Sequence, residues 1–415
     1  MSKVCSMFSQ ILQLISRTGF DIAARKHQAE RHARGFSSWG QFVAMLFCQL
    51  GGAKSLREIC GGLAATEGKL RHLGLRQAPP RSTLAYANEH RPWQLYEDVF
   101  QQLLTQCQAL AVQQSGGRRK FRFKHKLISL DATVIDLCAS VFDWARFRRT
   151  KGAVKLHLLL DHDGFLPCYA VITEGKQHEV PVAQQLHYEP GTLLVMDRGY
   201  NDYSWFAHLT QQAVYFVTRM KENADYLVLD DRELPRRKGI VRDQVICFFQ
   251  QARQGQESYF RRIEFYDEEQ DRVLVFVTNH LTLAAATVAE VYKRRWHIEL
   301  FFKALKQSLR VKTFVGTSAN ALKTQVWAAL IAMLLIKYLQ LKATFGWSLS
   351  NLVALLRQQL FVYRDLWVWI DHPFQAPELP EVLPEQLPMV WQYLDSSPLR
   401  QETIVAKLTI SGAAI

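Results

Sequence analysis

The apolar pattern of the chain changes at residue 127, and this change limits the folds open to it. From there the sequence holds short runs rich in Val, Ile and Leu, namely LISLDATVIDL, VKLHLLL and LPCYAVIT. Runs of this length and composition predict three successive strands, and the Asp163-Gly164 pair predicts a turn between the second and the third. We therefore expect an antiparallel meander at the start of this region.

Strands and helices alternate after the meander. A helix is expected near residues 181–186, followed by a buried strand, TLLVMD, that ends at Asp197, then a helix over DYSWFAHLTQQ and a strand over VYFVTRM. Residues 222–283 hold further strand-like runs between charged turns and form a predicted β-rich insertion. Helical periodicity returns at residue 284. This order indicates a mixed α/β sheet flanked by helices.

At 415 residues, the chain exceeds the size at which a single hydrophobic core stops growing, so two or three domains are expected. The N-terminal part shows apolar residues at helical spacing, in FVAMLFCQL and YEDVFQQLLTQCQAL, and predicts an all-α domain. The expected divisions are an N-terminal helical domain (1–112), a basic connector (113–126), a first α/β part (127–221), the β-rich insertion (222–283), a second α/β part (284–345) and a helical C-terminal region (346–415).

Positive charge is concentrated at one end of the chain. Residues 1–126 carry 19 Lys and Arg against 7 Asp and Glu, a net of +12, which leaves +1 of the total +13 for the rest. This distribution predicts that the N-terminal third binds a polyanion such as DNA; a solvated basic surface is the alternative. The residues expected to contact phosphates are Arg118, Arg119, Lys120, Arg122 and Lys124 in the connector, and Arg17, Arg25, Lys26, Arg31 and Arg34 before it.

Several classes of protein are disfavoured by the sequence. The seven cysteines are scattered, with no C-x-x-C pair, which suits a reducing cytosol and argues against a zinc site. The most apolar segment, 326–336, is shorter than the ~20 residues that cross a bilayer, so we expect a buried core helix and no membrane partner. The run GGAKS lacks the Gly before Lys of a phosphate-binding loop, so no nucleotide cofactor is expected. The N-terminus has no continuous apolar stretch of a signal peptide, and a cytoplasmic location is expected.

The segment YKRRWHIELFFKALKQ, residues 292–307, is predicted to be a helix without a breaker. At the usual helical pitch, four of its polar residues fall within an arc of about 60°, namely Tyr292, Arg295, Glu299 and Lys306. Apolar residues border this arc, with Trp296 and Leu300 on one side. A charged stripe between apolar shoulders indicates the floor of a half-buried site, whereas an ordinary exposed Arg–Glu pair is the alternative.

Two aspartates precede this helix in the α/β region. Asp131 lies within the first predicted strand, and Asp197 lies at the end of TLLVMD. A carboxylate in an apolar strand is costly to bury without a partner, and a metal ion is a suitable one. Asp131, Asp197 and Glu299 together could hold two Mg²⁺ ions at about 3.5 to 4 Å for phosphoryl transfer. The hard oxygen ligands favour Mg²⁺ or Mn²⁺.

The sequence resembles transposases of the insertion sequence 4 family, whose signature is Tyr, two residues, Arg, three residues, Glu, six residues, Lys. Tyr292, Arg295, Glu299 and Lys306 match that spacing, and the surroundings of the two aspartates, LDATVID and MDRGY, also match. The resemblance covers roughly residues 8–400. It implies a ribonuclease-H-like core, a β-rich insertion between the second Asp and the Glu, and a helical N-terminal domain.

The resemblance also implies roles for the matching residues. Asp131, Asp197 and Glu299 would be catalytic metal ligands, and Tyr292, Arg295 and Lys306 would contact DNA phosphates near the cut. Water would cleave the transposon end, and the freed 3′-hydroxyl would attack target DNA. The expected partners are the terminal repeats and target DNA, bound by a homodimer on the nucleoid of the bacterial cytoplasm. Arg198, next to Asp197, is a further candidate DNA contact, with a tight turn as the alternative.

Two other functions stay open on the sequence. A metal-dependent nuclease on the same core would use the same three carboxylates but would not join strands. A transposase-derived protein without activity would retain only DNA binding. Among side chains near the site, we expect Trp205 and Trp296 to pack in the core and His178 to lie on the surface.

Overall fold

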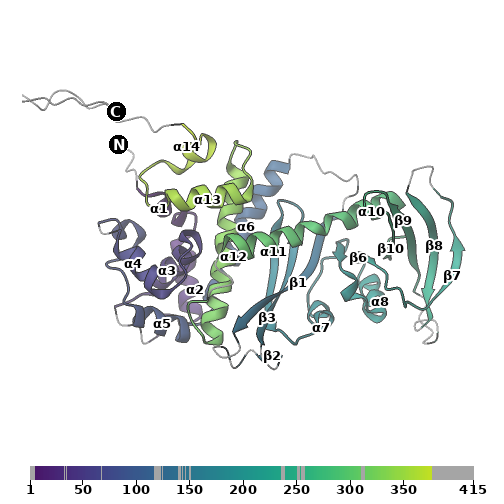
Figure 1. The fold of residues 1–415 in the computed structure, drawn as a ribbon, viewed down its shortest axis with the longest axis horizontal. Coiled ribbons are helices and arrows are strands. Elements are labelled where there is room, and N and C mark those ends of the chain that lie inside the picture. The colour runs from purple at the N-terminus through teal and green to yellow at the C-terminus, as the bar shows by residue number, and fades with distance from the viewer. Residues whose placement is uncertain are drawn as a thin grey trace, which may run out of the picture. The chain divides into compact units, whose positions relative to one another are not determined.

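Ten strands form one mixed sheet in the described part of the chain, with helices packed around it (Figure 1). The structure is a computed structural model. It describes residues 5–375 except 32, 34, 67, 116–122, 124, 139–141, 143, 145, 149–150, 235–238, 250–252, 254–257 and 310–313.

The predicted antiparallel meander is confirmed. It consists of β1 (Leu127–Cys138), β3 (Lys151–Asp161) and β4 (Leu166–Glu174), and a short strand, β2 (Arg146–Arg148), also pairs with β3. The expected turn between β3 and β4 contains Gly164 at φ +80°, a left-handed conformation that glycine adopts without steric cost.

Two parallel strands extend the meander on the other side of β1. Strand β5 (Leu193–Met196) pairs in parallel with β1, and β6 (Tyr215–Arg219) pairs in parallel with β5. All four residues of β5 are buried, as expected for a parallel strand covered on both faces. The predicted helices are present as α7 (Glu179–Gln184) and α8 (Tyr203–Gln211).

The resulting strand order is β4-β3-β1-β5-β6, antiparallel on one side of β1 and parallel on the other. This is the ribonuclease-H-like arrangement, and it agrees with the fold class expected from the sequence. The central strand is β1, which carries Asp131. Its position makes β1 the frame on which the other candidate site residues are placed.

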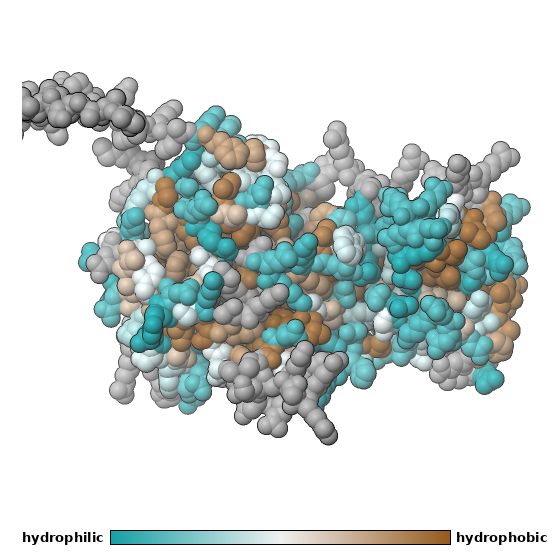
Figure 2. Space-filling view, viewed as in Figure 1, coloured by the Kyte–Doolittle hydropathy of each residue, from teal (hydrophilic) through white to brown (hydrophobic). Residues whose placement is uncertain are grey.

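The four strand-like runs after β6 also form strands, and they continue the same sheet. They are β7 (Tyr226–Asp231), β8 (Ile240–Phe248), β9 (Phe260–Asp267) and β10 (Arg272–Thr278). Strand β10 pairs antiparallel with β6, so the sheet runs on without a break. Several apolar side chains of these strands are exposed, including Leu229 on β7 and Val273 on β10, and hydrophobic surface is visible over this part of the molecule in Figure 2.

The N-terminal region is helical, as expected. Its helices are α1 (Met7–Leu12), α2 (Arg17–Lys26), α3 (Ser38–Gly51), α4 (Leu56–Ala64), α5 (Arg81–His90) and α6 (Gln94–Ser115), with a short 3₁₀ helix, η1 (Leu70–Leu73). Serine residues cap several of them: Ser16, Ser37 and Ser55 each accept a hydrogen bond from a main-chain N–H in the first turn.

Helix α12 (Ala319–Lys342) lies in the core of the helical region. It contacts α3, α5 and α6, and its side chains are buried along most of its length. The helix is long and apolar enough to cross a membrane, but 83% of its apolar window is buried among other elements of the protein. The predicted core helix over residues 326–336 is therefore confirmed.

Helices before and after α12 complete the described chain. They are α10 (Ala285–Arg294), α11 (Trp296–Ser308), α13 (Leu349–Gln359) and α14 (Leu366–Asp371). One hydrophobic core joins the N-terminal helices to α11, α12, α13 and α14 and to the meander. Near the start of the chain, the Met7 N–H donates to the carbonyl oxygen of Val362, so the two regions also share main-chain hydrogen bonds.

The expectation of one unbroken helix over residues 292–307 was wrong in one detail. Helix α10 ends at Arg294 and α11 begins at Trp296, with Arg295 between them at φ −52° and ψ −32°. The hydrogen bonds at this point span three residues, from the Arg295 N–H to Tyr292 O and from the Ile298 N–H to Arg295 O. The junction is thus a tightened, 3₁₀-like turn that keeps the chain nearly helical.

Candidate active site

Asp131 and Asp197 occupy equivalent positions on neighbouring parallel strands. Leu130 of β1 is the register partner of Met196 of β5, and the two aspartates are the next residues along each strand. Parallel neighbours lie about 4.8 Å apart in a sheet. The strand pairing therefore places Asp131, within β1, beside Asp197, which directly follows the end of β5.

Glu299 reaches this position from α11 through Arg295. The Arg295 guanidinium lies 3.5 Å from Asp131 Oδ2 through Nη1 and 2.6 Å from Glu299 Oε1 through Nη2. Its side chain is 16% exposed, and that of Asp131 is 19% exposed. Arg295 thus bridges a strand carboxylate and a helix carboxylate in a partly desolvated environment, where such pairs are stronger than at the surface.

Lys306 fixes the same helix to the same strand. Its Nζ donates a hydrogen bond to the Val134 carbonyl oxygen of β1 at 2.7 Å. The buried side of α11, which includes Ile298, Phe302 and Leu305, belongs to the large hydrophobic core. Helix α11 is therefore held on β1 by apolar packing and by two cationic side chains.

Negative charge and burial act together on Asp131. Its pKa is raised from 3.8 to about 6; burial is the largest cause, the charges of Asp197 and Glu299 add to the rise, and the Ala132 N–H and Arg295 oppose it. The Ala132 N–H donates to Asp131 Oδ1 at 2.8 Å. Because both other carboxylates act on Asp131, the three form one electrostatic cluster.

Tyr292 is buried beside this cluster. Its ring packs against Phe276 of β10 with centroids 5.0 Å apart, and the Arg295 guanidinium carbon lies 5.6 Å from the Tyr292 ring centroid. Burial raises the pKa of the Tyr292 hydroxyl, and the negative charge of Asp197 adds to the shift. The structure thus brings all four residues of the helical motif to the region of the two aspartates.

The remaining predicted contacts have different surroundings. Arg198 lies in the 3₁₀ helix η3 (Arg198–Tyr200) with a half-exposed side chain, 4.0 Å from a Glu222 carboxylate oxygen. The five connector residues Arg118, Arg119, Lys120, Arg122 and Lys124 lie outside the described residues, as does Arg34.

Two of the three neighbouring side chains lie where we expected them. Trp205 is 2% exposed and His178 is exposed, as predicted. The expectation that Trp296 packs in the core was wrong, because its side chain is 56% exposed. The reason is that α11 packs against the core through Ile298, Phe302 and Leu305, which leaves Trp296 and Leu300 exposed to solvent next to Glu299.

Tyr200 adds an unsatisfied polar atom close to the carboxylates. The residue is 1% exposed, and its Oη is buried without a hydrogen-bond partner among the described residues. Burial is the main cause that raises the pKa of this hydroxyl, and the charges of Asp131, Glu179 and Asp197 contribute. A buried hydroxyl without a partner is uncommon, and in a cluster of acids it marks a place for a further polar ligand.

A lysine and glutamate pair in the same region was missed from the sequence. Lys155 of β3 lies 3.1 Å from Glu179 of α7 and also donates to the Gln177 carbonyl oxygen at 2.9 Å. The lysine side chain is 12% exposed. A charged residue inside the apolar run VKLHLLL is the signal that could have identified it.

The donor set fits a hard divalent cation, although Arg295 lies between two of its members. Among the described residues, no three His, Cys, Asp or Glu side chains are arranged as a ready metal-binding group. An Asp131 carboxyl whose pKa is raised by the charges of Asp197 and Glu299 is nevertheless the kind of oxygen-ligand cluster that a hard divalent cation stabilises. The residues present suit such an ion once the guanidinium bridge opens.

Comparison with protein families gives two matches along the chain. Residues 122–335 match the family described as Transposase DDE domain, which covers both aspartates and the whole helical motif. Residues 4–76 match a family described as Domain of unknown function (DUF4372).

Individual proteins are similar over most of this chain. A Sinorhizobium fredii protein whose name describes it as a transposase is 27% identical over 74% of this chain and 85% of its own length. A Geobacillus stearothermophilus protein, named as a transposase for insertion sequence element IS5377, is 29% identical over 65% of this chain and 70% of its own. A solved piggyBac transposase synaptic complex with hairpin DNA has 9% identity and a TM-score of 0.41 over 89% of this chain and 80% of that one, too low a similarity to support an argument. The DDE match covers just over half of this chain and contains all three carboxylates, so the chain belongs to the DDE transposase family and is a DNA transposase of the insertion sequence 4 type.

Proposed function

We propose that Asp131, Asp197 and Glu299 are the catalytic carboxylates of this transposase and that they hold two Mg²⁺ ions. The observation that carries the proposal is the meeting of a strand pair and a helix at one cluster: Asp131 and Asp197 follow register partners, and Arg295 bridges Asp131 to Glu299. DDE transposases use divalent ions, which when bound supply Lewis-acid stabilisation of charge on the reacting phosphate.

The reaction has two phosphoryl-transfer steps with the same balance of atoms. In the first, a water molecule loses a proton as its oxygen bonds to phosphorus at the transposon end, the P–O3′ bond breaks, and the leaving 3′ oxygen takes up a proton to become a hydroxyl. In the second, that 3′-hydroxyl loses its proton as its oxygen bonds to a target phosphorus, the target P–O3′ bond breaks, and the leaving 3′ oxygen takes up a proton. The rigid pairing of β1 with β5 keeps Asp131 and Asp197 in position for both steps.

The basic side chains of the helical motif suit contacts with DNA phosphates. Arg295 presents a planar guanidinium that already binds two carboxylate groups, and phosphate oxygens offer it the same geometry. We assign Arg295, Lys306 and the hydroxyl of Tyr292 to the DNA strand near the cut, and Arg198 to the strand beyond it. The connector residues Arg118, Arg119, Lys120, Arg122 and Lys124 would contact the backbone further away.

The wider assembly completes the proposal. The net charge of +12 in residues 1–126 supports an end-binding role for the helical domain, 1–112, and the connector, 113–126. We propose that the protein acts as a homodimer on the terminal repeats, in the bacterial cytoplasm and on the nucleoid.

The test is a cleavage and strand-transfer assay on a supercoiled plasmid that carries the flanking repeats, with Mg²⁺. Glu299→Gln removes one ligand charge at constant size and should abolish both products while DNA binding persists. Glu290→Gln, an exposed glutamate on α10, is the matched control and should act like wild type.

Each other outcome identifies a competing function. Cleavage without joined products would favour a nuclease on the same core. Binding without any cut strand would favour an inactive DNA-binding protein. Full activity of Glu299→Gln would remove this residue from the site.

A further inference from the structure

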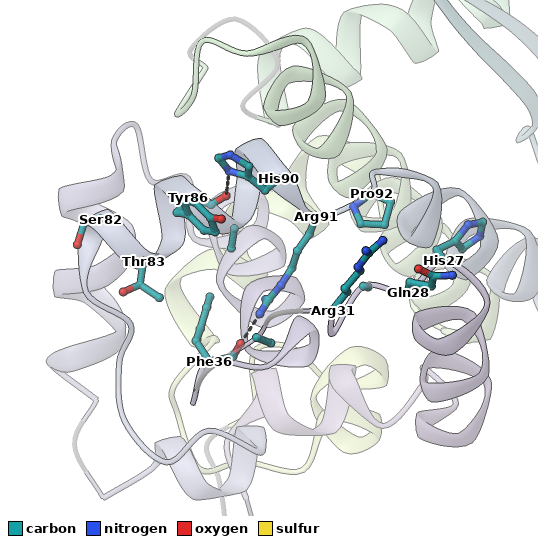
Figure 3. Close-up of a pocket in the computed structure, with 13 residues that line it drawn as sticks. His27, Gln28, Arg31, Phe36, Ser82, Thr83, Tyr86, His90, Arg91 and Pro92 are labelled. Carbon is teal, nitrogen blue, oxygen red and sulfur yellow. Dashed lines mark hydrogen bonds between the residues drawn. The ribbon is translucent and has the colours of Figure 1, made fainter.

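A cleft of about 800 Å³ lies in the N-terminal helical region (Figure 3). One wall is formed by the end of α2 and the segment after it, including Gln28 and Arg31. The other wall is the face of α5 that carries Ser82, Tyr86 and His90. Its volume is within the range of cavities that bind organic ligands.

The described residues that line the cleft are cationic or neutral, and none of them is Asp or Glu. Its two arginines differ in their surroundings. Arg91 is fixed, because its guanidinium donates to the carbonyl oxygens of Phe36 and Ser37 and lies 4.0 Å from a Glu30 carboxylate oxygen.

Arg31 is exposed, and no ion pair between described residues includes it. In the close-up it projects between Arg91 and Gln28 (Figure 3). An exposed cation at a cleft that makes no ion pair with a described residue favours an anionic ligand such as a phosphate group.

An aromatic pair stands on the opposite wall. The rings of Tyr86 and His90 stack with centroids 3.9 Å apart and an angle of 18° between their planes. The His90 Nδ1 lies 2.9 Å from the Tyr86 carbonyl oxygen, and because a carbonyl only accepts, this nitrogen carries the proton. Tyr86 is therefore supported from behind, yet it is 64% exposed.

An exposed arginine and a stacked aromatic pair in one cleft are not typical of a protein interface or of a small apolar ligand site. An exposed, pre-oriented ring in the same cleft as an exposed arginine offers a face for a planar base and a charge for its phosphate. The Ser82 and Thr83 hydroxyls on the same helix add hydrogen-bond donors for phosphate oxygens. These are the parts needed to hold one nucleotide that is not stacked in a duplex.

We propose that this cleft binds an unpaired nucleotide of a DNA strand, with its base stacked on Tyr86 and its phosphate on Arg31. The inference rests on the proposed function in that the strand is DNA handled during transposition, where cut ends expose unpaired bases. It adds a second DNA-binding site, separate from the carboxylates, to the helical region.

The experiment measures binding of full-length protein to two labelled DNAs without metal, so that no strand is cut. One is a blunt duplex and the other is the same duplex with a short single-stranded overhang that contains 2-aminopurine. Tyr86→Ala should weaken binding of the overhang DNA about 5- to 150-fold, the range for loss of one base stack, and remove the quenching of 2-aminopurine fluorescence. Tyr86→Trp should restore both.

Arg31 is tested through the dependence of binding on salt. Arg31→Ala should lower the slope of log affinity against log salt by about 1 for the overhang DNA, because one phosphate contact is lost. The matched controls are Tyr169→Ala, an exposed tyrosine on β4, and Arg272→Ala, an exposed arginine on β10 that does not line the cleft. Neither should change the preference for the overhang.

Three results would overturn the proposal. The first is wild-type affinity of Tyr86→Ala for the overhang DNA. The second is an equal loss of affinity for the blunt and the overhang DNAs. The third is displacement of the overhang DNA by a free deoxynucleoside monophosphate at a concentration equal to that at which the overhang DNA saturates the protein. A failure here is distinguishable from failure of the proposed function, because the cleavage comparison of wild type with Glu299→Gln does not depend on Tyr86.

Discussion

The Lys306 ammonium donates a hydrogen bond to the Val134 carbonyl oxygen at 2.7 Å, three residues along β1 from Asp131. The motif lysine therefore links the helix of Glu299 to the strand of Asp131 in the protein without DNA. This contact gives the lysine a positioning role besides the DNA contact proposed for it.

The two roles of Lys306 make different predictions. If it positions α11, Lys306→Ala should lower the thermal unfolding midpoint of the DNA-free protein by a few degrees, as expected for a lost hydrogen bond to a charged group worth about 1.5 to 3 kcal/mol. Cleavage should fall but not vanish. A variant with reduced cleavage and an unchanged unfolding midpoint would show that Lys306 acts on DNA alone.

Arg295 should compete with divalent ions for the carboxylates. In Arg295→Ala the guanidinium no longer occupies the space between Asp131 and Glu299. We expect Mn²⁺ to bind this variant more tightly than wild type, about tenfold, because no bridge has to open first, and cleavage to drop sharply. Titration calorimetry with Mn²⁺ measures the affinity, with Glu299→Gln as the variant that should bind more weakly. Equal affinity for wild type and Arg295→Ala would contradict the competition.

A buried histidine should make the fold sensitive to acid. His157 of β3 is 2% exposed, hydrogen-bonds with Thr173, and has its pKa lowered from 6.5 to about 4, mainly by burial. Above pH 6.5 the His157 side chain is neutral in the folded and in the unfolded chain, so it does not change the free energy of unfolding with pH. As the pH falls from 6.5 to 4, only the unfolded chain binds the proton, so stability decreases, by about 2 to 3 kcal/mol over the window.

His157→Gln keeps a side chain that can hydrogen-bond with Thr173 but cannot titrate. Thermal unfolding at pH 7 and at pH 4.5 should show a smaller loss of stability for this variant than for wild type. The same loss in both proteins would mean that His157 is protonated as easily in the fold as in the unfolded chain.

Lys337 of α12 should destabilise the protein at neutral pH. Its ammonium lies 5.8 Å from the Phe165 ring centroid and 3.2 Å from Gln340 Oε1, and burial lowers its pKa from 10.5 to about 8. Below pH 8 Lys337 is protonated in both the folded and the unfolded chain, and the folded protein bears the full free-energy cost of burying the charged ammonium. Between pH 8 and 10.5 only the unfolded chain holds the proton, so stability rises with pH, and above 10.5 the effect is gone.

Replacement of this lysine by an apolar side chain removes the cost. Lys337→Met should stabilise the protein by about 1 to 3 kcal/mol at pH 7, a value reduced from the full shift because the side chain is partly exposed. The gain should vanish near pH 10.5. Unfolding midpoints of the two proteins at pH 7 and pH 10.5 provide the comparison, and a gain that persists at the higher pH would assign it to packing instead.

The features that the sequence predicted correctly are local ones. The apolar runs around Asp131 and Asp197 identify their strands because burial on two faces demands continuous apolar residues, as in LLVM. Helical pitch likewise allows the sequence to place the four residues of the helical motif on one face. The pairing of Leu130 with Met196, which brings the aspartates together, depends on a parallel crossover that no single segment encodes.

The features that were missed depend on docking between distant segments. Arg295 interrupts its helix while it bridges Asp131 and Glu299, and its backbone angles remain helical, so no breaker residue marks the place. Trp296 is exposed because other residues of α11 meet the core. Arg31 and Tyr86 line the same cleft in the N-terminal helical region, and the sequence shows no pattern that links these two positions.

The shared core around α12 has a consequence for shortened copies of the gene. Helix α12 contacts α3, α5 and α6. Helices α13 and α14, which follow it in the sequence, contribute side chains to the same core. A product that stopped before residue 319 would leave the apolar faces of the N-terminal helices open to water. Such a fragment would aggregate or be degraded and would not persist as a stable competitor for transposon ends. Truncation should therefore silence an element without creating a repressor of its intact relatives.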